Sequence, residues 1–233
     1  LTRVVVAPFL ITNNTEIERN DALVLVKISC LKNIKSNFNK DAFIVYENDK
    51  EISSQLYNDG FDCSIIFVSD FNPNEAKNFK IKYLKHGALR KNYSSKTYAE
   101  LAMKFDAEYK NKKFAKDKFQ NFTKVVVPKI HTDHDALFKY EGPGWESEKV
   151  GYRFYLDWRN ATDIFGKKKE QLILHKVGTN DVVAKDDSYH EMQEWGMDIF
   201  KVGNTLGIGS IGMMSNNKIE MVSKTDELTC EIT

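Results

Sequence analysis

The strongest chemical signal in the chain lies in residues 151–159, GYRFYLDWR. Side chains of a β-strand alternate between two faces. One face would be apolar and aromatic, and we expect it to pack in a core: Tyr152, Phe154, Leu156 and Trp158. The other would carry two of the five arginines of the chain together with a phenol and a carboxylate: Arg153, Tyr155, Asp157 and Arg159.

Two interpretations of this polar face stay open. In the functional one, Arg153 and Arg159 bind the carboxylate of an acidic substrate, and Tyr155 transfers a proton. In the structural one, the face is exposed to solvent and covered by Arg–Asp–Arg ion pairs. We favour the functional interpretation, because arginine is scarce in this chain and these two residues lie close together.

A cluster of imidazole and carboxylate groups precedes this strand at residues 131–135, HTDHD. Imidazole exchanges protons near neutral pH, so His131 and His134 could serve in acid–base chemistry. The same residue types bind metals, but HExxH is absent and the spacing matches no established zinc motif. Acid–base catalysis, a metal site and loop hydrogen bonding remain as alternatives. We predict no required cofactor and commit to no metal.

Aromatic residues gather beside glycine-rich turns in the second half of the chain. Ten of the 12 glycines and all three tryptophans lie beyond residue 141. The Gly-Pro-Gly turn at 142–144 would present Trp145 and Glu146, and a later segment holds His190 and Trp195. Such aromatics are typical of a sugar-binding cleft and equally of a β-sandwich core.

Length and composition indicate a globular protein of ordinary make-up. The chain has 233 residues, 42% hydrophobic and 29% charged, with a formal charge of +1. The balanced charge gives no general attraction to nucleic acid, which we exclude as a partner. No run approaches the roughly 18–20 apolar residues of a membrane span.

Three widely spaced cysteines support neither a disulfide framework nor a zinc ribbon. Walker A and GxSxG motifs are absent.

The elements that must position these residues are mainly strands. Short β-branched and aromatic runs separated by Asn/Asp/Gly turns predict antiparallel strands at 4–12, 22–31, 42–48, 63–71 and 78–84. Residues 96–124 are rich in lysine, without Gly or Pro, and Leu101, Phe105 and Tyr109 recur at helical spacing. We therefore predict a β region at 1–95, a basic helical connector at 96–124 and a second β region at 125–233, together forming an antiparallel β-sandwich.

Residues 124–168 and 188–214 resemble the DUF4861 family of polysaccharide-degrading Bacteroidetes. The N-terminal part is also similar, at 13–19, 51–56 and 59–79. The resemblance implies an oligosaccharide dehydratase with a galactose-mutarotase-like β-sandwich, acting on ulvan-type chains. It also implies export to the periplasm or cell surface of a Gram-negative bacterium, which fits a chain that opens at Leu1. Family members usually extend beyond the equivalent of Thr233, so we expect C-terminal strands to be missing here.

Such an enzyme would remove water from a terminal uronate and leave a 4,5-unsaturated sugar. It must neutralise the carboxylate, take the C5 proton and protonate the departing 4-hydroxyl. We assign the first task to Arg153 and Arg159, and proton transfer to His134, Tyr155 and His190 without fixing which is base and which is acid. The remaining candidates would bind the substrate, an acidic oligosaccharide with or without sulfate: Trp145, Glu146, His131, Asp157 and Trp195.

Two other classes of function remain. A polysaccharide lyase or an epimerase begins with the same C5 proton abstraction, and residue types do not separate these enzymes from a dehydratase. A non-catalytic carbohydrate-binding protein would need the tryptophans and arginines but would have no use for an acid–base pair.

Overall fold

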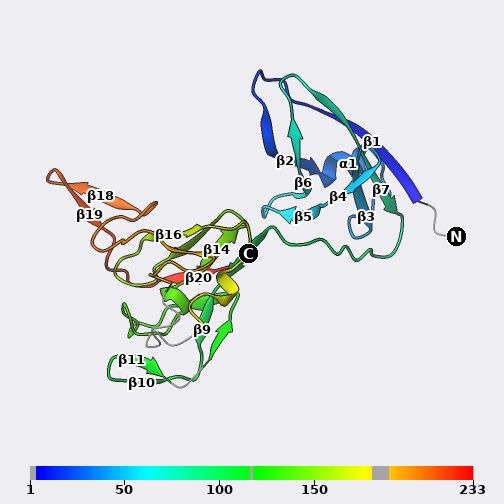
Figure 1. The fold of residues 1–233 in the computed structure, drawn as a ribbon. Helices are drawn as coiled ribbons and strands as arrows, with labels where there is room; N and C mark the ends of the chain where they lie inside the picture. The colour runs from blue at the N-terminus through cyan, green and yellow to red at the C-terminus, as the bar shows by residue number, and fades with distance from the viewer. Residues whose placement is uncertain (1–3, 116–117, 180–188, 233) are drawn as a thin grey trace. The chain divides into compact units, whose positions relative to one another are not determined.

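The computed structural model describes residues 4–115, 118–179 and 189–232, and it divides the chain into two compact units (Figure 1). The N-terminal unit is Leu1–Ser94 and the C-terminal unit is Ser95–Thr233. Within the described parts of the chain, no helix is long and apolar enough to cross a membrane.

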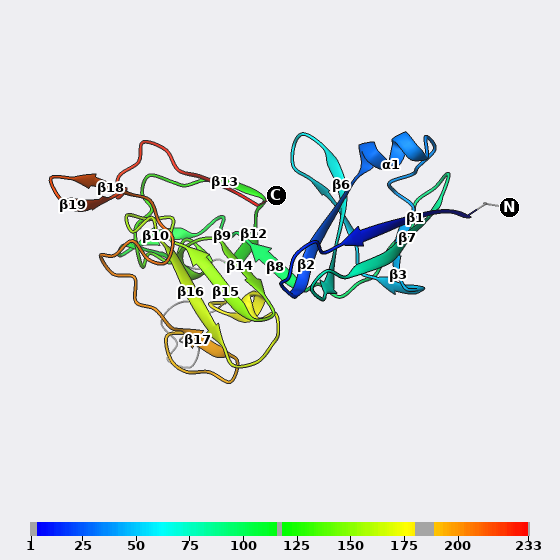
Figure 2. The same ribbon diagram turned by 90° about the horizontal axis from the view of Figure 1, so that it is seen from above.

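The N-terminal unit consists of two antiparallel sheets and one short helix (Figures 1 and 2). The first sheet has the strand order β1 (Val4–Thr12), β7 (Ala76–Leu84), β3 (Phe43–Glu47) and β4 (Lys50–Ile52). The second has the order β2 (Arg19–Lys27), β6 (Cys63–Phe71) and β5 (Gln55–Asn58). The strand predicted at 22–31 is shorter than expected, because α1 (Ile28–Ile34) follows β2 directly.

The core of this unit lies between the two sheets. Inward-facing side chains of both sheets form one buried cluster, in which the rings of Phe67 on β6 and Phe79 on β7 lie 5.1 Å apart. Ile28 and Leu31 of α1 join the same cluster. The β-branched and aromatic runs that predicted these strands therefore supply the apolar side chains that the two sheets bury between them.

The C-terminal unit is built around one five-stranded antiparallel sheet. Its order is β17 (Gly196–Asp198), β16 (Thr162–Lys167), β15 (Val150–Phe154), β14 (Gly144–Ser147) and β8 (Thr97–Glu100). Among the described residues, the unit also contains four two-stranded pairs: β9 (Ala102–Lys104) with β12 (Phe119–Asn121), β10 (Glu108–Lys110) with β11 (Lys113–Ala115), β13 (Lys124–Val126) with β20 (Thr229–Glu231), and β18 (Gly212–Ser215) with β19 (Lys218–Met221). Two 3₁₀ turns, η1 (Lys139–Glu141) and η2 (Leu174–Lys176), lie between the strands.

The helix predicted at 96–124 is wrong. That stretch forms β8 to β12 within the C-terminal unit. The lysine-rich part is a hairpin: Lys110 pairs with Lys113, and the two residues between them, Asn111 and Lys112, have φ of 51° and 63°. Such a turn suits a tight antiparallel connection. The helical spacing of apolar residues was coincidental, since Phe105 is exposed while Leu101 is fully buried.

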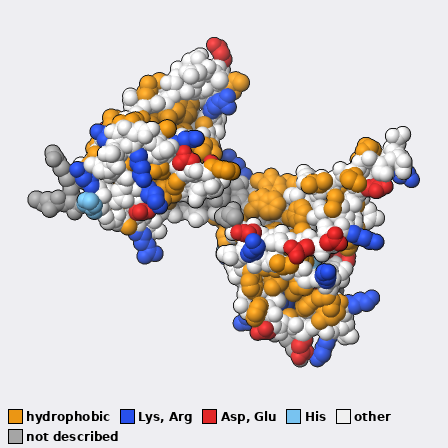
Figure 3. Space-filling view, turned by 180° about the vertical axis from the view of Figure 1, so that it is seen from behind, with side chains coloured by type: hydrophobic (Ala, Val, Ile, Leu, Met, Phe, Trp, Pro, Cys, Tyr) orange, Lys and Arg blue, Asp and Glu red, His pale blue; other side chains and the backbone are white. Residues whose placement is uncertain are grey.

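The prediction of a mainly β, antiparallel fold is confirmed. Acidic, basic and apolar side chains are interspersed on the face that Figure 3 shows, so charge of one sign does not cover it. This distribution agrees with the formal charge of +1.

Candidate functional site

The polar face predicted for residues 151–159 points into the protein. Strand β15 ends at Phe154, and the chain continues as a loop. Arg153 is only 1% exposed and Tyr155 is also buried, whereas Trp158, predicted to be in the core, is 38% exposed. The predicted assignment of the two faces is therefore wrong at these positions. The charged face can be internal because its charges are paired there.

Carboxylates surround Arg153. Its guanidinium donates through Nε to Asp163 at 3.0 Å and through Nη2 to Asp163 at 2.7 Å and Asp198 at 2.5 Å. Nη1 donates to the hydroxyl of Tyr189 at 3.1 Å. Burial acts to lower the pKa of Arg153, but the surrounding phenols and carboxylates raise it overall. Arg153 is thus a permanent internal cation that holds β15, β16 and β17 together, rather than a side chain presented to a substrate.

Arg159 is paired in a similar way. Its Nε lies 2.9 Å from Oδ1 of Asp157, and Nη2 donates to Oε1 of Glu141 at 2.7 Å. These ion pairs raise the pKa of Arg159 against the effect of burial. They also keep the pKa of Glu141 below its usual range although burial opposes this. Both arginines therefore already have anionic partners inside the protein.

Tyr155 lies between the two arginines, as the strand alternation predicted. The guanidinium carbon of Arg159 is 3.6 Å from its ring centroid, and Arg153 donates to its hydroxyl. The hydroxyl in turn donates to Oδ2 of Asp163 at 2.7 Å. Burial, reinforced by Asp163, raises the pKa of Tyr155 far above its ordinary value despite Arg153. The neighbouring arginines therefore do not make this phenol a base, because its hydroxyl donates to the buried carboxylate of Asp163.

Four predicted residues meet at one cavity of about 600 Å³: His134, Tyr155, Arg159 and His190. We call this cavity the candidate pocket. Its other walls come from Asp133, Glu141, Trp158 and residues 198–204. Segments about 70 residues apart in the sequence therefore line one pocket, because the sheet brings them together.

Two histidine–carboxylate pairs face this pocket. Nδ1 of His134 lies 3.1 Å from Oδ2 of Asp133, and Nδ1 of His190 lies 3.1 Å from Oδ2 of Asp198. Both imidazoles are well exposed, at 67% and 58% of their side-chain surface. A carboxylate at Nδ1 orients the ring and leaves Nε2 for proton exchange with a ligand.

The two pairs differ in their electrostatic surroundings. Burial acts to raise the pKa of Asp133, but hydrogen bonds from His134, Thr132 and Trp158 keep it below its ordinary value. Asp133 is thus an anion directed at His134. Asp198 instead shares its charge between His190 and the buried guanidinium of Arg153. The carboxylate at His134 thus lies at the pocket, whereas the carboxylate at His190 also belongs to the buried ion-pair network of Arg153.

The backbone beside the pocket adopts an unusual conformation. Five non-glycine residues in the described chain that are neither Asn nor Asp have positive φ, and four lie between positions 134 and 141: His134, Ala136, Tyr140 and Glu141. Left-handed backbone is unfavourable for such residues and is often found at functional sites, where surrounding contacts hold it in place.

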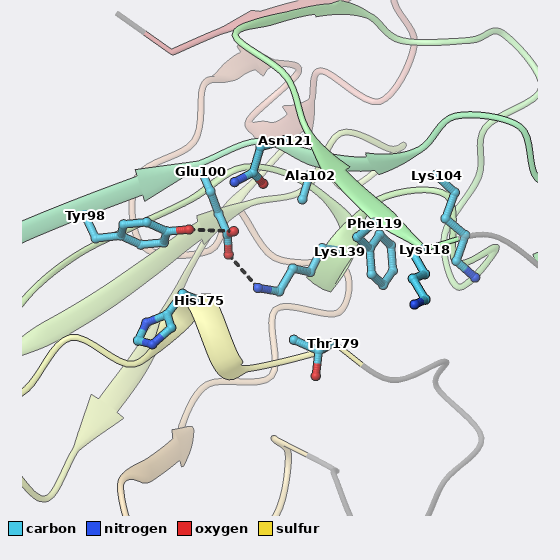
Figure 4. A pocket seen from close by; sticks show the side chains of 10 residues that line it. All are labelled: Tyr98, Glu100, Ala102, Lys104, Lys118, Phe119, Asn121, Lys139, His175 and Thr179. Carbon is cyan, nitrogen blue, oxygen red and sulfur yellow. Dashed lines mark hydrogen bonds and ion pairs between the residues drawn. The ribbon is translucent and has the colours of Figure 1, made fainter.

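The contacts that hold this segment lie around a second cavity, which Figure 4 shows. Glu100 accepts hydrogen bonds from Lys139 Nζ at 2.7 Å, from the Tyr140 hydroxyl at 2.5 Å and from the Tyr98 hydroxyl at 2.8 Å. The Glu100–Lys139 contact lies at the centre of the view, and His175 stands apart from it (Figure 4). This internal network anchors η1 and so fixes Glu141 at the candidate pocket.

The glycines of the Gly-Pro-Gly turn allow close packing against the same segment. A Cβ at Gly144 would come within 2.5 Å of the Tyr140 hydroxyl, and one at Gly142 within 1.9 Å of the Phe154 carbonyl oxygen. The glycines of the turn thus allow Tyr140 and β15 to pack closely against it.

Five predicted binding residues lie away from the candidate pocket. Trp145 stacks on Tyr152, and Trp195 packs against Phe165. Glu146 is a fully buried ion-pair partner of Lys167. His131 and Asp157 line a different cavity of about 610 Å³, which shares the Trp158 wall.

Sequence reasoning missed Trp158 as a pocket residue because strict alternation assigned it to the core; the end of β15 at Phe154 breaks that alternation.

The 131–135 cluster does not come together as one group. His131 bonds to Asp135 inside the protein, at 2.8 Å, whereas His134 bonds to Asp133 at the candidate pocket. Within the described part of the chain, no group of three or more His, Cys, Asp or Glu side chains is arranged to hold a metal ion.

A family model described as a domain of unknown function, DUF4861, matches residues 11–233. No curated protein and no solved structure matches the chain significantly. The family predicted from the sequence is confirmed, since the match spans nearly the whole chain. The chain belongs to the DUF4861 family.

Proposed function

We propose that the protein is a carbon–oxygen lyase that removes water from the terminal uronate of an acidic oligosaccharide, leaving a 4,5-unsaturated uronate. One observation carries the proposal: two exposed histidines, each oriented by a carboxylate, line one pocket that also has an exposed tryptophan. β-Elimination needs such a pair, because one group takes a proton while another gives one.

We assign His134 as the base and His190 as the acid. Asp133 contacts Nδ1 of His134 and Asp198 contacts Nδ1 of His190, so Nε2 of each ring is the nitrogen left to exchange a proton with the substrate. In the reaction, His134 takes the C5 proton, and the C5–H electron pair forms the C4–C5 double bond. The C4–O bond breaks, and the proton of His190 converts the departing hydroxyl into water.

The C5 proton lies next to a carboxylate, whose negative charge must be balanced for the proton to leave. Lys201 and Arg159 are the permanent cations that line the pocket, and protonated His190 adds another charge. Because Arg159 is already paired with Asp157 and Glu141, Lys201 takes the larger share of this task. Trp158 offers an exposed ring on which the apolar face of a sugar can stack.

The test is incubation with saturated, uronate-terminated ulvan-type oligosaccharides. A dehydratase produces ultraviolet absorbance from the new conjugated double bond and a product lighter by one water, without chain shortening. An exported protein in the periplasm or on the cell surface would meet such a substrate. Two fragments would instead indicate a polysaccharide lyase, and an isomer of unchanged mass an epimerase. Binding without any product would indicate a carbohydrate-binding protein.

Two variants test whether His134 and His190 take part in proton transfer. His134→Ala and His190→Ala should each lower kcat by about 10²–10⁴. The matched control is His175→Ala, because His175 is an exposed histidine of the same unit and does not line the candidate pocket. Equal activity in all three variants would remove the two histidines from the mechanism.

A further inference from the structure

We propose that Glu141 is the positioning residue of the candidate pocket and that it holds the base, His134, in place. The inference rests on the proposed function, which names His134 as the base. Glu141 lines the pocket but is not one of the groups that exchange protons in the proposed reaction. Its side chain is 13% exposed, so the surrounding protein encloses most of it.

One carboxylate oxygen of Glu141 joins two residues of the pocket. Oε1 accepts the backbone amide of His134 at 3.0 Å and Nη2 of Arg159 at 2.7 Å. Oε2 lies 3.7 Å from Nη1 of the buried Arg153. The two arginines thus fix the carboxylate, and the fixed carboxylate holds the amide of His134.

The backbone of His134 needs such a contact because its conformation is unfavourable. Its φ is 59°, and left-handed backbone persists in a residue of this kind where surrounding contacts hold it. The hydrogen bond to Glu141 is one of these contacts, and it spans seven residues of the sequence. Since φ sets the direction in which the side chain leaves the backbone, the same bond helps to keep Nδ1 of His134 at 3.1 Å from Asp133.

The backbone of Glu141 is itself held on both sides. Its amide donates to the carbonyl of Phe138 at 3.1 Å, and its carbonyl accepts the amide of Leu156 at 3.1 Å. The preceding residue, Tyr140, donates its hydroxyl proton to Glu100. A side chain on a backbone fixed in this way can keep a neighbouring catalytic group in one geometry.

The contacts of Glu141 do not suit it to be the base itself. Burial acts to raise its pKa, but Arg159, Arg153 and the amide of His134 keep that pKa below its ordinary value. Oε1 is 3.8 Å from Nδ1 of His134, whereas Asp133 is 3.1 Å from the same nitrogen. Glu141 therefore acts on the backbone of His134, and Asp133 acts on its imidazole.

Two variants separate the position of the carboxylate from its charge. Glu141→Gln keeps an acceptor oxygen at the same reach and loses the charge, whereas Glu141→Asp keeps the charge and withdraws the oxygen by one carbon–carbon bond. We expect Glu141→Gln to keep kcat within about tenfold and Glu141→Asp to lower kcat about 100-fold, both with KM nearly unchanged. The opposite order would show that the charge matters and would overturn the inference. If Glu141→Asp does not fold, a loss of about 100-fold in folded Glu141→Gln would overturn it alone.

Asp157→Asn is the matched control. Asp157 is the other carboxylate partner of Arg159, through Nε at 2.9 Å, and it does not line the candidate pocket. The substitution removes a charge beside Arg159 and keeps the hydrogen bond between Glu141 and His134, so kcat should stay within about threefold of the parent. A loss of kcat equal to that of Glu141→Asp would show that Glu141 works through Arg159, which would overturn the inference.

Amide exchange tests the positioning of His134 without any activity. By NMR, the His134 amide should exchange with deuterium at similar rates in the parent and in Glu141→Gln, and about tenfold faster or more in Glu141→Asp. Equal rates in all three would overturn the inference, whether or not the protein dehydrates uronates. Faster exchange in Glu141→Asp, in a protein that forms no unsaturated product from ulvan-type oligosaccharides, would support the positioning of His134 and overturn the proposed function.

Discussion

The hydroxyl of Tyr155 lies 2.7 Å from Oδ2 of Asp163 and donates its proton to that buried carboxylate. The proton is therefore directed into the protein, although the ring forms part of the candidate pocket. This geometry separates Tyr155, as a positioning residue, from the two exposed histidines.

Tyr155→Phe should consequently retain activity within about tenfold, because a general acid or base is expected to contribute more. The variant should lose about 1 kcal/mol of stability, the net value of one hydrogen bond. Steady-state kinetics and urea denaturation measure the two effects. A far larger loss of kcat in a fully folded variant would show that Tyr155 takes part in proton transfer.

Glu146→Gln should destabilise the protein without changing KM. Glu146 and Lys167 are both within 1% of full burial, and the carboxylate also accepts the amides of Ile173 and Leu174. Leaving Lys167 buried without its counter-charge should cost about 3–5 kcal/mol. The control is Glu194→Gln, which removes the exposed pair with Lys169 and should leave the melting temperature unchanged. A raised KM in folded Glu146→Gln would restore Glu146 as a binding residue.

Gly144→Ala should destabilise the segment that carries Glu141. The added Cβ would come within 2.5 Å of the Tyr140 hydroxyl, so that Tyr140 must move away from Glu100. We expect a loss of about 1–3 kcal/mol, as for other overpacked sites. At Gly209 the nearest atom would be 3.8 Å from the new Cβ, so Gly209→Ala serves as the control. Similar melting temperatures for the two variants would show that Tyr140 adjusts easily.

Acidic pH should lower the stability of the folded protein, partly because Glu141 becomes protonated. Its pKa in the folded state is below the ordinary value of 4.5, so the folded state binds its proton less readily than the unfolded state. The resulting stability is present above about pH 4.5 and is lost as the pH falls through the lowered pKa. Glu141→Gln should therefore flatten the fall in melting temperature below about pH 5. Parallel curves for the variant and the parent would exclude this contribution.

The sequence predicted well where one local pattern decided the structure. Strands β1, β3, β6 and β7 form where β-branched and aromatic runs are bounded by turn residues, and the predicted ranges 4–12 and 63–71 match β1 and β6. Residues 96–124 were mispredicted because many lysines and chance spacing conceal a hairpin whose turn depends on Asn111 and Lys112.

The candidate site was predictable in its residue types but not in its pairings. His134, Tyr155, Arg159 and His190 meet at one pocket, as their chemistry suggested. The sequence could not show that Asp163 and Asp198, from β16 and β17, would surround Arg153. Those contacts depend on strand order, and they change Arg153 from a predicted substrate contact into an internal support.

The pairing of β13 with β20 joins Val125 to Cys230, which are more than 100 residues apart in the C-terminal unit. Every residue that lines the candidate pocket or the cavity of about 610 Å³ beside Trp158 lies within the range from Val127 to Leu228. Both cavities are therefore lined by the part of the chain that lies between these two paired strands. Cutting the chain before Thr229 would leave β13 without its partner strand, although none of the residues removed lines either cavity.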